Sequence, residues 1–185
     1  IGFGGGCLPK DIRAFMARAE ELQVQEALTF LKEVDAINLR RRHHAVNLAI
    51  LAADGSVAGK RIAVLGITFK PDTDDMRDSP ALAIAQKLQD RDAHVVVMDP
   101  QAGENLRRSR NGMEVADSIE EAVAGADVVM VLTPWREFLE MDPAQLRSLV
   151  KSPIIVDGRN VLDSKAWEAA GWSYHGMGRS SSIWS

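Results

Sequence analysis

The chain contains one cysteine, Cys7, and the residues around it suit a nucleophile. Residues 2–11 read GFGGGCLPKD, so the thiol follows four glycines in five positions and precedes a lysine and an aspartate. Glycines adopt positive φ and let the backbone approach a ligand closely. Pro9 suits the first turn of a helix, so we expect Cys7 at a helix N-terminus, where the helix dipole and Lys10 favour the thiolate. The alternative is an inert buried cysteine, which does not need this density of glycine and charge.

Three further loops carry groups that could bind a phosphorylated ligand, and each follows an expected strand. They are residues 68–77 (TFKPDTDDMR), 133–136 (TPWR) and 157–160 (DGRN). In open α/β sheets, ligands bind beyond the carboxyl ends of the strands. We therefore expect Lys70, Arg77 and Arg159 to point into one crevice, an arrangement suited to phosphates. The alternative is that these cations are surface charges balanced by the aspartates of the first loop.

The usual glycine signatures for dinucleotides and ATP are absent. Residues 66–69, directly after the first expected strand, read GITF, with no G-x-G-x-x-G, and no Walker A pattern occurs in the chain. Asp99 ends the next strand, where a ribose-binding acid often lies, but without the glycines we interpret it as a turn former. This region is therefore expected to bind a nucleotide in another way than the usual dinucleotide mode.

Composition excludes several classes of partner. The 185 residues are 46% hydrophobic with a net charge of −4, so no general basic surface points to nucleic acid. The basic run at residues 40–44 (RRRHH) lacks interleaved aromatics and is interpreted as the solvated face of a helix. No apolar stretch is long enough to span a bilayer, and no signal peptide is visible. A single unpaired cysteine fits a reducing cytoplasm, and no candidate ligands have the spacing of a metal site.

The first part of the chain has a helical pattern. Apolar residues recur at three- and four-residue steps at positions 28, 31, 34, 37, 45, 48 and 51, which predicts helices over residues 11–22 and 25–53. The second helix is long for a domain of this size. It suits a spine that bridges two domains or pairs with a second copy, so we expect a homodimer through this helix. Residues 54–60 then read as a linker.

Strands and helices alternate in the rest of the chain. We expect strands at residues 61–66, 94–98, 127–132 and 154–156, and helices at 80–91, 118–124 and 143–150, with Ser79 and Ser118 as N-caps. Short apolar strands separated by helices indicate a parallel sheet covered on both faces. The fold class is therefore α/β, with a long helical segment and cysteine loop over residues 1–56 and a Rossmann-like domain over residues 57–185.

At this point the motifs resemble those of the UDP-glucose/GDP-mannose dehydrogenase family. Residues 2–11 follow its cysteine signature G-F-G-G-S-C-F/L-P-K-D, and residues 66–80 follow G-x-x-F-K-P-x-T-D-D-x-R-x-S-P. The D-G-R at 157–159 and the segment YHGMGR at 174–179 also fit. The resemblance covers the catalytic loop, the central dimerisation helix and the UDP-sugar-binding domain of that family. Because Ile1 is not a methionine and directly precedes the glycines, we expect a fragment that lacks the upstream NAD-binding domain.

The resemblance implies a chemistry for the thiol. Such enzymes oxidise the C6 alcohol of a nucleotide sugar to a carboxylate, with two NAD⁺ in turn and through a cysteine thiohemiacetal and thioester. It implies Cys7 as the nucleophile and Asp11 as the acid/base or water-orienting carboxylate. It implies NAD contacts from Lys10 and Arg77, and UDP-sugar contacts from Gly2, Phe3, Gly4, Phe69, Lys70 and Arg159.

The sequence departs from the family pattern in two respects. Gly6 stands where serine is usual, and the family's upstream catalytic lysine, asparagine and glutamate have no counterpart, so the chain alone is expected to show no turnover. The proline and paired aspartates of residues 69–75 favour UDP-glucose over GDP-mannose, and Lys10 and Asp11 disfavour UDP-N-acetylmannosamine. A non-catalytic sugar-nucleotide-binding and dimerisation module is the alternative for the chain by itself. A cysteine hydrolase is disfavoured because no histidine stands in a catalytic context.

Overall fold

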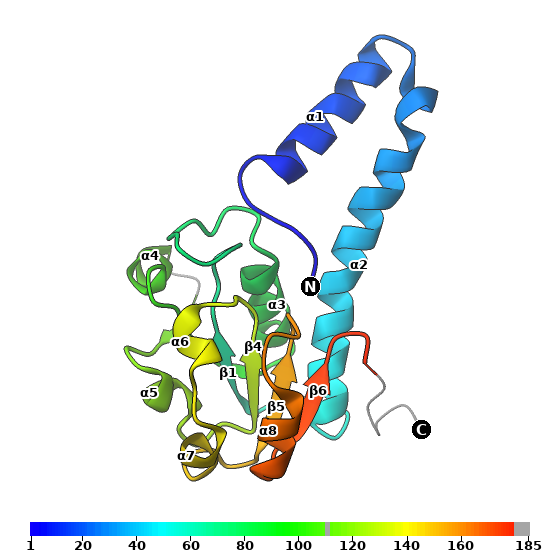
Figure 1. Cartoon of the computed structure of the whole chain (residues 1–185). Helices are drawn as coiled ribbons and strands as arrows, with labels where there is room; N and C mark the ends of the chain where they lie inside the picture. The colour runs from blue at the N-terminus through cyan, green and yellow to red at the C-terminus, as the bar shows by residue number, and fades with distance from the viewer. Residues whose placement is uncertain (110–111, 180–185) are drawn as a thin grey trace.

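The computed structural model of the protein describes residues 1–109 and 112–179. A parallel six-stranded sheet with the strand order β3-β2-β1-β4-β5-β6 forms its centre, and a helical hairpin projects from one end (Figure 1). This confirms the α/β class, the parallel sheet and the long helix that the sequence predicts.

The sheet is built from short apolar strands. They are β1 (Arg61–Leu65), β2 (His94–Met98), β3 (Glu114–Val115), β4 (Val128–Val131), β5 (Ile154–Asp157) and β6 (Ser173–Gly176). In the central register, Leu65 of β1 pairs with Met98 of β2 and Val131 of β4. All four residues of β4 are buried, as expected for a parallel strand that is covered on both faces.

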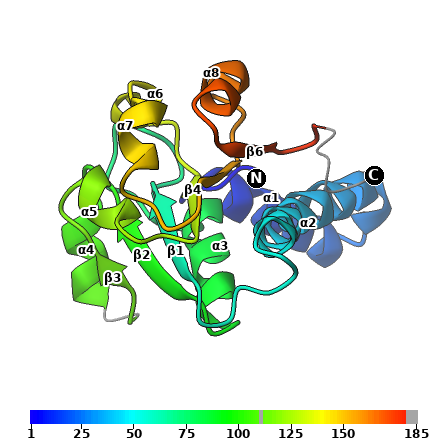
Figure 2. The same cartoon turned by 90° about the horizontal axis from the view of Figure 1, so that it is seen from below.

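Helices cover both faces of this sheet. The helices of the described residues are α1 (Leu8–Glu21), the 3₁₀ turn η1 (Gln25–Leu28), α2 (Thr29–Ala52), α3 (Pro80–Gln89), α4 (Gly103–Ser109), α5 (Ile119–Val123), α6 (Arg136–Leu139), α7 (Pro143–Arg147) and α8 (Ser164–Ala169). Of these, α1, η1 and the first half of α2 form the projecting hairpin and do not cover the sheet (Figure 1). The end of α2 and α3 pack with Ile62 and Val64 on one face. Side chains from α5 to α8 pack with Ala63 and Leu65 on the other, so the two faces carry separate apolar clusters. Figure 2 shows α2 and α3 on one side of the sheet and α5, α6 and α7 on the other.

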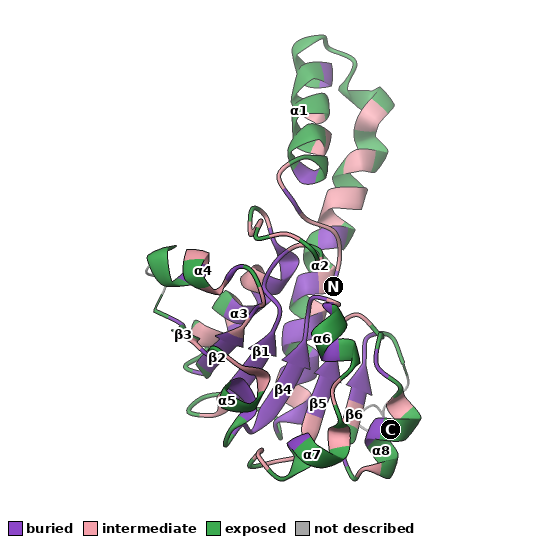
Figure 3. Ribbon diagram, turned by 60° about the vertical axis from the view of Figure 1, so that its left-hand side comes forward, coloured by how far each residue is buried: buried purple, intermediate pink, exposed green. Residues whose placement is uncertain are grey.

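The helical hairpin follows the sequence prediction closely, with two shifts at its helix starts. Helix α1 begins at Leu8, earlier than expected, because Pro9 is accommodated in a first turn whose N–H groups need no helical partner. The predicted helix over residues 25–53 begins as the 3₁₀ turn η1 and continues as the 24-residue α2. Most of α1 and the first half of α2 are exposed or half-buried, whereas most residues of the strands β1, β2, β4 and β5 are buried (Figure 3).

Both predicted serine caps are present. Ser79 Oγ accepts a hydrogen bond from Leu82 N at 3.3 Å, and Ser118 Oγ accepts one from Glu121 N at 3.1 Å. The elements α4, β3, α6, α8 and β6 have no sequence prediction. Strand β6, which reads SYHG, owes its extended form to pairing with β5 rather than to its own composition.

The basic run at residues 40–44 is only partly a solvated face. Arg40 and His43 are exposed, but Arg42 is 6% exposed and pairs with Asp78. Within residues 1–109 and 112–179, no helix is long and apolar enough to cross a membrane, and no three His, Cys, Asp or Glu side chains gather as metal ligands.

Candidate functional site

Residues 2–7 form the cysteine segment, and its start is held by two side chains from different parts of the fold. Asn38 on α2 accepts a hydrogen bond from Phe3 N at 2.7 Å and donates one to Phe3 O at 3.0 Å. Arg159, in the loop after β5, donates from Nη1 to Gly2 O at 3.1 Å. Gly2 and Phe3, both expected to line the substrate, are therefore fixed between the long helix and the carboxyl edge of the sheet.

The glycines that follow lie against the loop between β1 and α3. Gly5 N donates to Arg77 O at 3.1 Å. A β-carbon placed on Gly4 would lie 2.3 Å from Asp78 O, and one placed on Gly5 would lie 2.9 Å from the Phe69 ring. The structure thus places Gly5 against the Phe69 ring. That these residues form one substrate site stays a prediction.

The space beside Gly6 is filled by the Arg77 guanidinium. A β-carbon on Gly6 would lie 2.8 Å from Arg77 Cζ, so a serine here would require the arginine to move. The Arg77 guanidinium is bidentate on Asp75, with Nε–Oδ1 and Nη2–Oδ2 distances of 3.0 and 2.8 Å. The hydrogen bond from Arg77 holds the pKa of Asp75 below its ordinary value. Because Arg77 is 77% exposed, this pair orients the guanidinium rather than stabilising the fold.

Cys7 is exposed at the N-cap of α1, in agreement with the expected helix N-terminus. Asp11 N donates to Cys7 O at 2.8 Å and closes the first turn, so Asp11 follows the thiol by one turn. Lys10 and Asp11 are both exposed. The pKa of Arg77 is raised, mainly by its hydrogen bond to Asp75.

The two other cations of the predicted site lie beside different groups. Lys70 Nζ is 5.7 Å from the centroid of the half-buried Phe69 ring and is otherwise exposed. Arg159 donates from Nε to Leu132 O at 2.9 Å, in addition to its bond to Gly2, and burial lowers its pKa. That Lys70, Arg77 and Arg159 share one crevice stays a prediction.

The loop that carries Arg159 is itself fixed by a buried carboxylate. Asp157 Oδ1 accepts from Arg159 N at 3.0 Å, and its Oδ2 accepts from Leu162 N and from Tyr174 Oη, both at 2.8 Å. Burial and the bond to Asp157 raise the pKa of Tyr174, so the phenol stays a donor. The aspartate of the D-G-R sequence therefore positions the arginine.

Asp99 forms turns, as interpreted from the sequence. Its Oδ2 accepts from Ile67 N at 2.8 Å and from Trp135 Nε1 at 3.3 Å, and its Oδ1 accepts from Ala102 N at 2.9 Å. Both oxygens are thus used by protein donors at the place where a dinucleotide ribose would bind. With Gly66 packed on Thr133, this edge of the sheet differs from the usual dinucleotide-binding mode.

Sequence reasoning missed a row of polar residues on α2. Asp35, Asn38 and Arg42 are spaced by three and four positions, so they share one face of the helix. Arg42 Nη2 lies 2.9 Å from Asp78 Oδ1, and Arg13 of α1 bridges Asp78 and Asp35 at 3.1 and 3.2 Å. The sequence signal that could have found these residues is their spacing of three and four positions, which places polar side chains along one face of a helix that also has an apolar period.

The fold and this cysteine segment define a Rossmann-like α/β protein with a thiol on the carboxyl side of its sheet. The sequence matches the UDP-binding domain of the UDP-glucose/GDP-mannose dehydrogenase family over residues 63–164, and the central domain of that family over residues 1–40. The first match covers more than half of the 185 residues. The chain belongs to the UDP-glucose/GDP-mannose dehydrogenase family of nucleotide-sugar oxidoreductases.

Individual relatives give the same result. The chain is 40% identical to a UDP-glucose 6-dehydrogenase of Rhizobium meliloti and 38% identical to the UDP-glucose 6-dehydrogenase YwqF of Bacillus subtilis. These matches cover 96% and 97% of the chain and 40% of each relative, so the chain spans well under half the length of these proteins. A UDP-glucose dehydrogenase from Pyrobaculum islandicum aligns over 95% of this chain and 38% of its own, with a TM-score of 0.79 and 32% identity.

Proposed function

We propose that this chain forms the cysteine-bearing and UDP-sugar-binding half of an NAD-dependent UDP-glucose 6-dehydrogenase. The observation that carries the proposal is the packing of the Cys7 segment on the carboxyl edge of a sheet whose family binds UDP. Relatives named UDP-glucose 6-dehydrogenase support the substrate. GDP-mannose is the alternative nucleotide sugar, and the single exposed thiol favours a reducing cytoplasm.

Cys7 supplies the covalent chemistry. Its thiolate adds to the C6 aldehyde of the sugar and, with one proton, gives a thiohemiacetal. Loss of the remaining hydride from C6 and of the proton from the hydroxyl oxygen on C6 leaves a thioester, and water then releases the carboxylic acid and the free thiol. The other hydride leaves C6 earlier, together with the hydroxyl proton, when the alcohol becomes the aldehyde. The two hydrides go to NAD⁺, which we assign to another part of the whole protein.

The other site residues bind and orient. Asp11, one turn after the thiol, takes a proton from the attacking water or positions it. Arg77 lies beside Gly6 and, with Lys10, reaches toward the phosphates of the cofactor. The UDP-sugar is held by the backbone and ring of the first segment and by the loops after β1 and β5, through Gly2, Phe3, Gly4, Phe69, Lys70 and Arg159.

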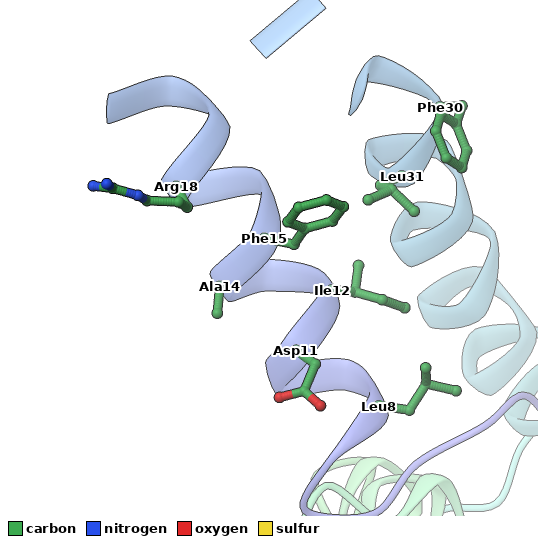
Figure 4. Close-up of a pocket in the computed structure, with 8 residues that line it drawn as sticks. All are labelled: Leu8, Asp11, Ile12, Ala14, Phe15, Arg18, Phe30 and Leu31. Carbon is green, nitrogen blue, oxygen red and sulfur yellow. The ribbon is translucent and has the colours of Figure 1, made fainter. Parts of the chain in front are cut away.

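The exposed hairpin carries a second part of the proposal, a homodimer through the central helices. A groove of about 580 Å³ lies between α1 and α2 and is lined by Leu8, Asp11, Ile12, Ala14, Phe15, Arg18, Phe30 and Leu31. Leu8, Ile12 and Phe15 lie on the side of α1 that faces α2 (Figure 4). Phe15 and Phe30 remain 59% and 62% exposed, and an apolar surface of this kind marks an interaction site.

Calorimetric titration of the chain with UDP-glucose and GDP-mannose tests the substrate. UDP-glucose is expected to bind more tightly, and Lys70→Ala to weaken it by roughly tenfold through loss of one charge-assisted hydrogen bond. Lys165→Ala on α8 is the matched control, because Lys165 is an exposed lysine away from these loops. Binding of neither sugar nucleotide contradicts the assigned pocket.

Turnover separates the enzyme from the non-catalytic module. The isolated chain is expected to reduce no NAD⁺ with UDP-glucose, since it lacks the family's upstream catalytic residues. In the whole protein, Cys7→Ser is expected to abolish formation of UDP-glucuronate while UDP-glucose still binds. A Cys7→Ser protein with unchanged turnover refutes the nucleophile, and NAD⁺ reduction by the isolated chain refutes the division of roles.

A further inference from the structure

Asn38 is buried in the middle of α2, and both polar groups of its side chain form hydrogen bonds with one residue of the cysteine segment. It is 3% exposed, although asparagine is a poor residue for a helix interior. Its Oδ1 accepts from Phe3 N at 2.7 Å and its Nδ2 donates to Phe3 O at 3.0 Å. The carboxamide thus satisfies both backbone polar groups of Phe3, as a neighbouring strand would.

The fit between Asn38 and the segment leaves no room for a side chain before Phe3. Gly2 has a φ of +93°, and a β-carbon there would lie 2.2 Å from Asn38 Oδ1. The glycine and the asparagine are therefore complementary: the first permits the close approach that the second uses.

The same face of α2 supports the next part of the segment. Arg42, one turn after Asn38, pairs with Asp78 at 2.9 Å, and the carbonyl of Asp78 lies against Gly4. Gly5 N then bonds to Arg77 O at 3.1 Å. A continuous series of contacts thus runs from α2 along the backbone that ends at Cys7.

We propose that Asn38 is a positioning residue for the nucleophile. By holding both polar groups of Phe3, it orders the whole backbone from Gly2 to Gly5 and so sets where Cys7 lies relative to the sugar-nucleotide loops. That the segment carries a nucleophile rests on the proposed function. The ordering of the segment by Asn38 does not, because it is a property of the chain without ligand.

Amide hydrogen exchange in Asn38→Ala tests the ordering. The Phe3 amide loses its acceptor, and its exchange is expected to speed up by roughly tenfold, the loss of about one hydrogen bond. The Gly5 amide bonds to Arg77 and not to Asn38, so a comparable acceleration at Gly5 shows that the segment as a whole is released. Acceleration at Phe3 alone, or at neither amide, overturns the proposal.

Asn38→Asp provides a test within one folded protein. A protonated carboxyl has one acceptor oxygen and one O–H donor, which match the two bonds to Phe3, whereas the carboxylate only accepts and faces the Phe3 carbonyl. Protection of the Gly5 amide, corrected for the intrinsic rate, is expected to be lost at pH 8 and restored toward the wild-type value at pH 5. Asn47→Asp, at an exposed position of the same helix, is expected to show no such change.

The outcomes separate this proposal from the proposed function. An Asn38→Asp protein whose Gly5 protection equals that of the wild type at both pH values refutes the positioning role. If the exchange results are as expected but the wild-type chain binds no UDP-glucose, the ordering stands and the assigned function fails. If both hold, Asn38→Asp is expected to bind UDP-glucose several-fold more weakly at pH 8 than at pH 5, relative to wild type.

Discussion

Single residues at the carboxyl edge of the sheet allow two loops to meet there. Gly66 follows β1 with a φ of +88°, and a β-carbon on it would lie 2.4 Å from Thr133 Cβ and 2.9 Å from Thr133 N. Thr133 in turn donates from its hydroxyl to Thr68 O at 2.7 Å in a buried position. The absence of a side chain at Gly66 therefore lets the loops after β1 and β4 pack against each other under the cysteine segment.

Gly66→Ala is expected to destabilise the protein because it combines backbone strain with a clash. The two effects together are expected to lower the free energy of unfolding by about 3 kcal/mol. Gly55→Ala is the matched control, since Gly55 has a φ of +87° but nothing within 4 Å of its added β-carbon. It is expected to cost about 1 kcal/mol. Urea unfolding of both variants measures the difference, and equal losses contradict the role of the contact with Thr133.

At the scale of elements, α2 has two halves with different surroundings. Its second half is in the core, where Ala45, Leu48 and Ala49 are buried against the sheet. Its first half contains apolar residues at the helical spacing noted in the sequence, yet one of them, Ile37, is 51% exposed. The residues that are buried where the two halves meet are polar, Asn38 and Arg42, and they bind the cysteine segment and the turn before α3. Helix α2 thus connects the hairpin to the α/β domain.

The ion pair between α2 and the turn before α3 is expected to matter for stability. The side chain of Arg42 is 8% exposed, so Arg42→Ala leaves Asp78 with one partner fewer in a half-buried site. Breaking such a pair is expected to cost about 3 kcal/mol. Arg40→Ala, two residues earlier on the same helix, removes an exposed pair with Glu33 and is expected to cost at most about 0.5 kcal/mol. Thermal or urea unfolding compares them, and similar losses contradict the buried role of Arg42.

In the whole chain, the sheet is covered on both faces, on one of them partly by the second half of α2, whereas the rest of the hairpin has few buried side chains. The sheet has an apolar cluster on each face, whereas the buried residues of α1 are Pro9 and Ala19. Other apolar side chains of the hairpin, among them Phe15 and Phe30, line the groove in Figure 4, and Leu22, Val24 and Ile37 are exposed elsewhere on it. This exposed apolar surface supports the proposed homodimer.

Sedimentation velocity tests the dimer. The chain is expected to sediment as a dimer at micromolar concentration, and the double variant Phe15→Glu and Phe30→Glu to sediment as a monomer, because two carboxylates would be buried in the interface. Leu139→Glu is the control, since Leu139 is 46% exposed on α6, away from the hairpin. A monomeric wild-type chain, or a double variant that stays dimeric, contradicts the proposed interface.

The sequence by itself determined the elements whose signals are local. The apolar strands β1, β2, β4 and β5, the serine caps of α3 and α5, and a helix N-terminus beside Cys7 all follow from patterns within about ten residues. The cysteine and loop signatures also led to the family. These features were predictable because a period, a cap or a motif is contained in one stretch of chain.

The tertiary structure decided which groups hold the cysteine segment. Asn38 and Phe3 are 35 residues apart, and Arg159 and Gly2 are 157 apart, so no local pattern links them. It also decided that Arg42 is buried, that β6 is a strand, and that Arg77 fills the space beside Gly6. Each of these depends on the packing of α2 and of the loops after β1 and β5 around one edge of the sheet, and a hydrogen-bond partner across that distance exists only once the chain has folded.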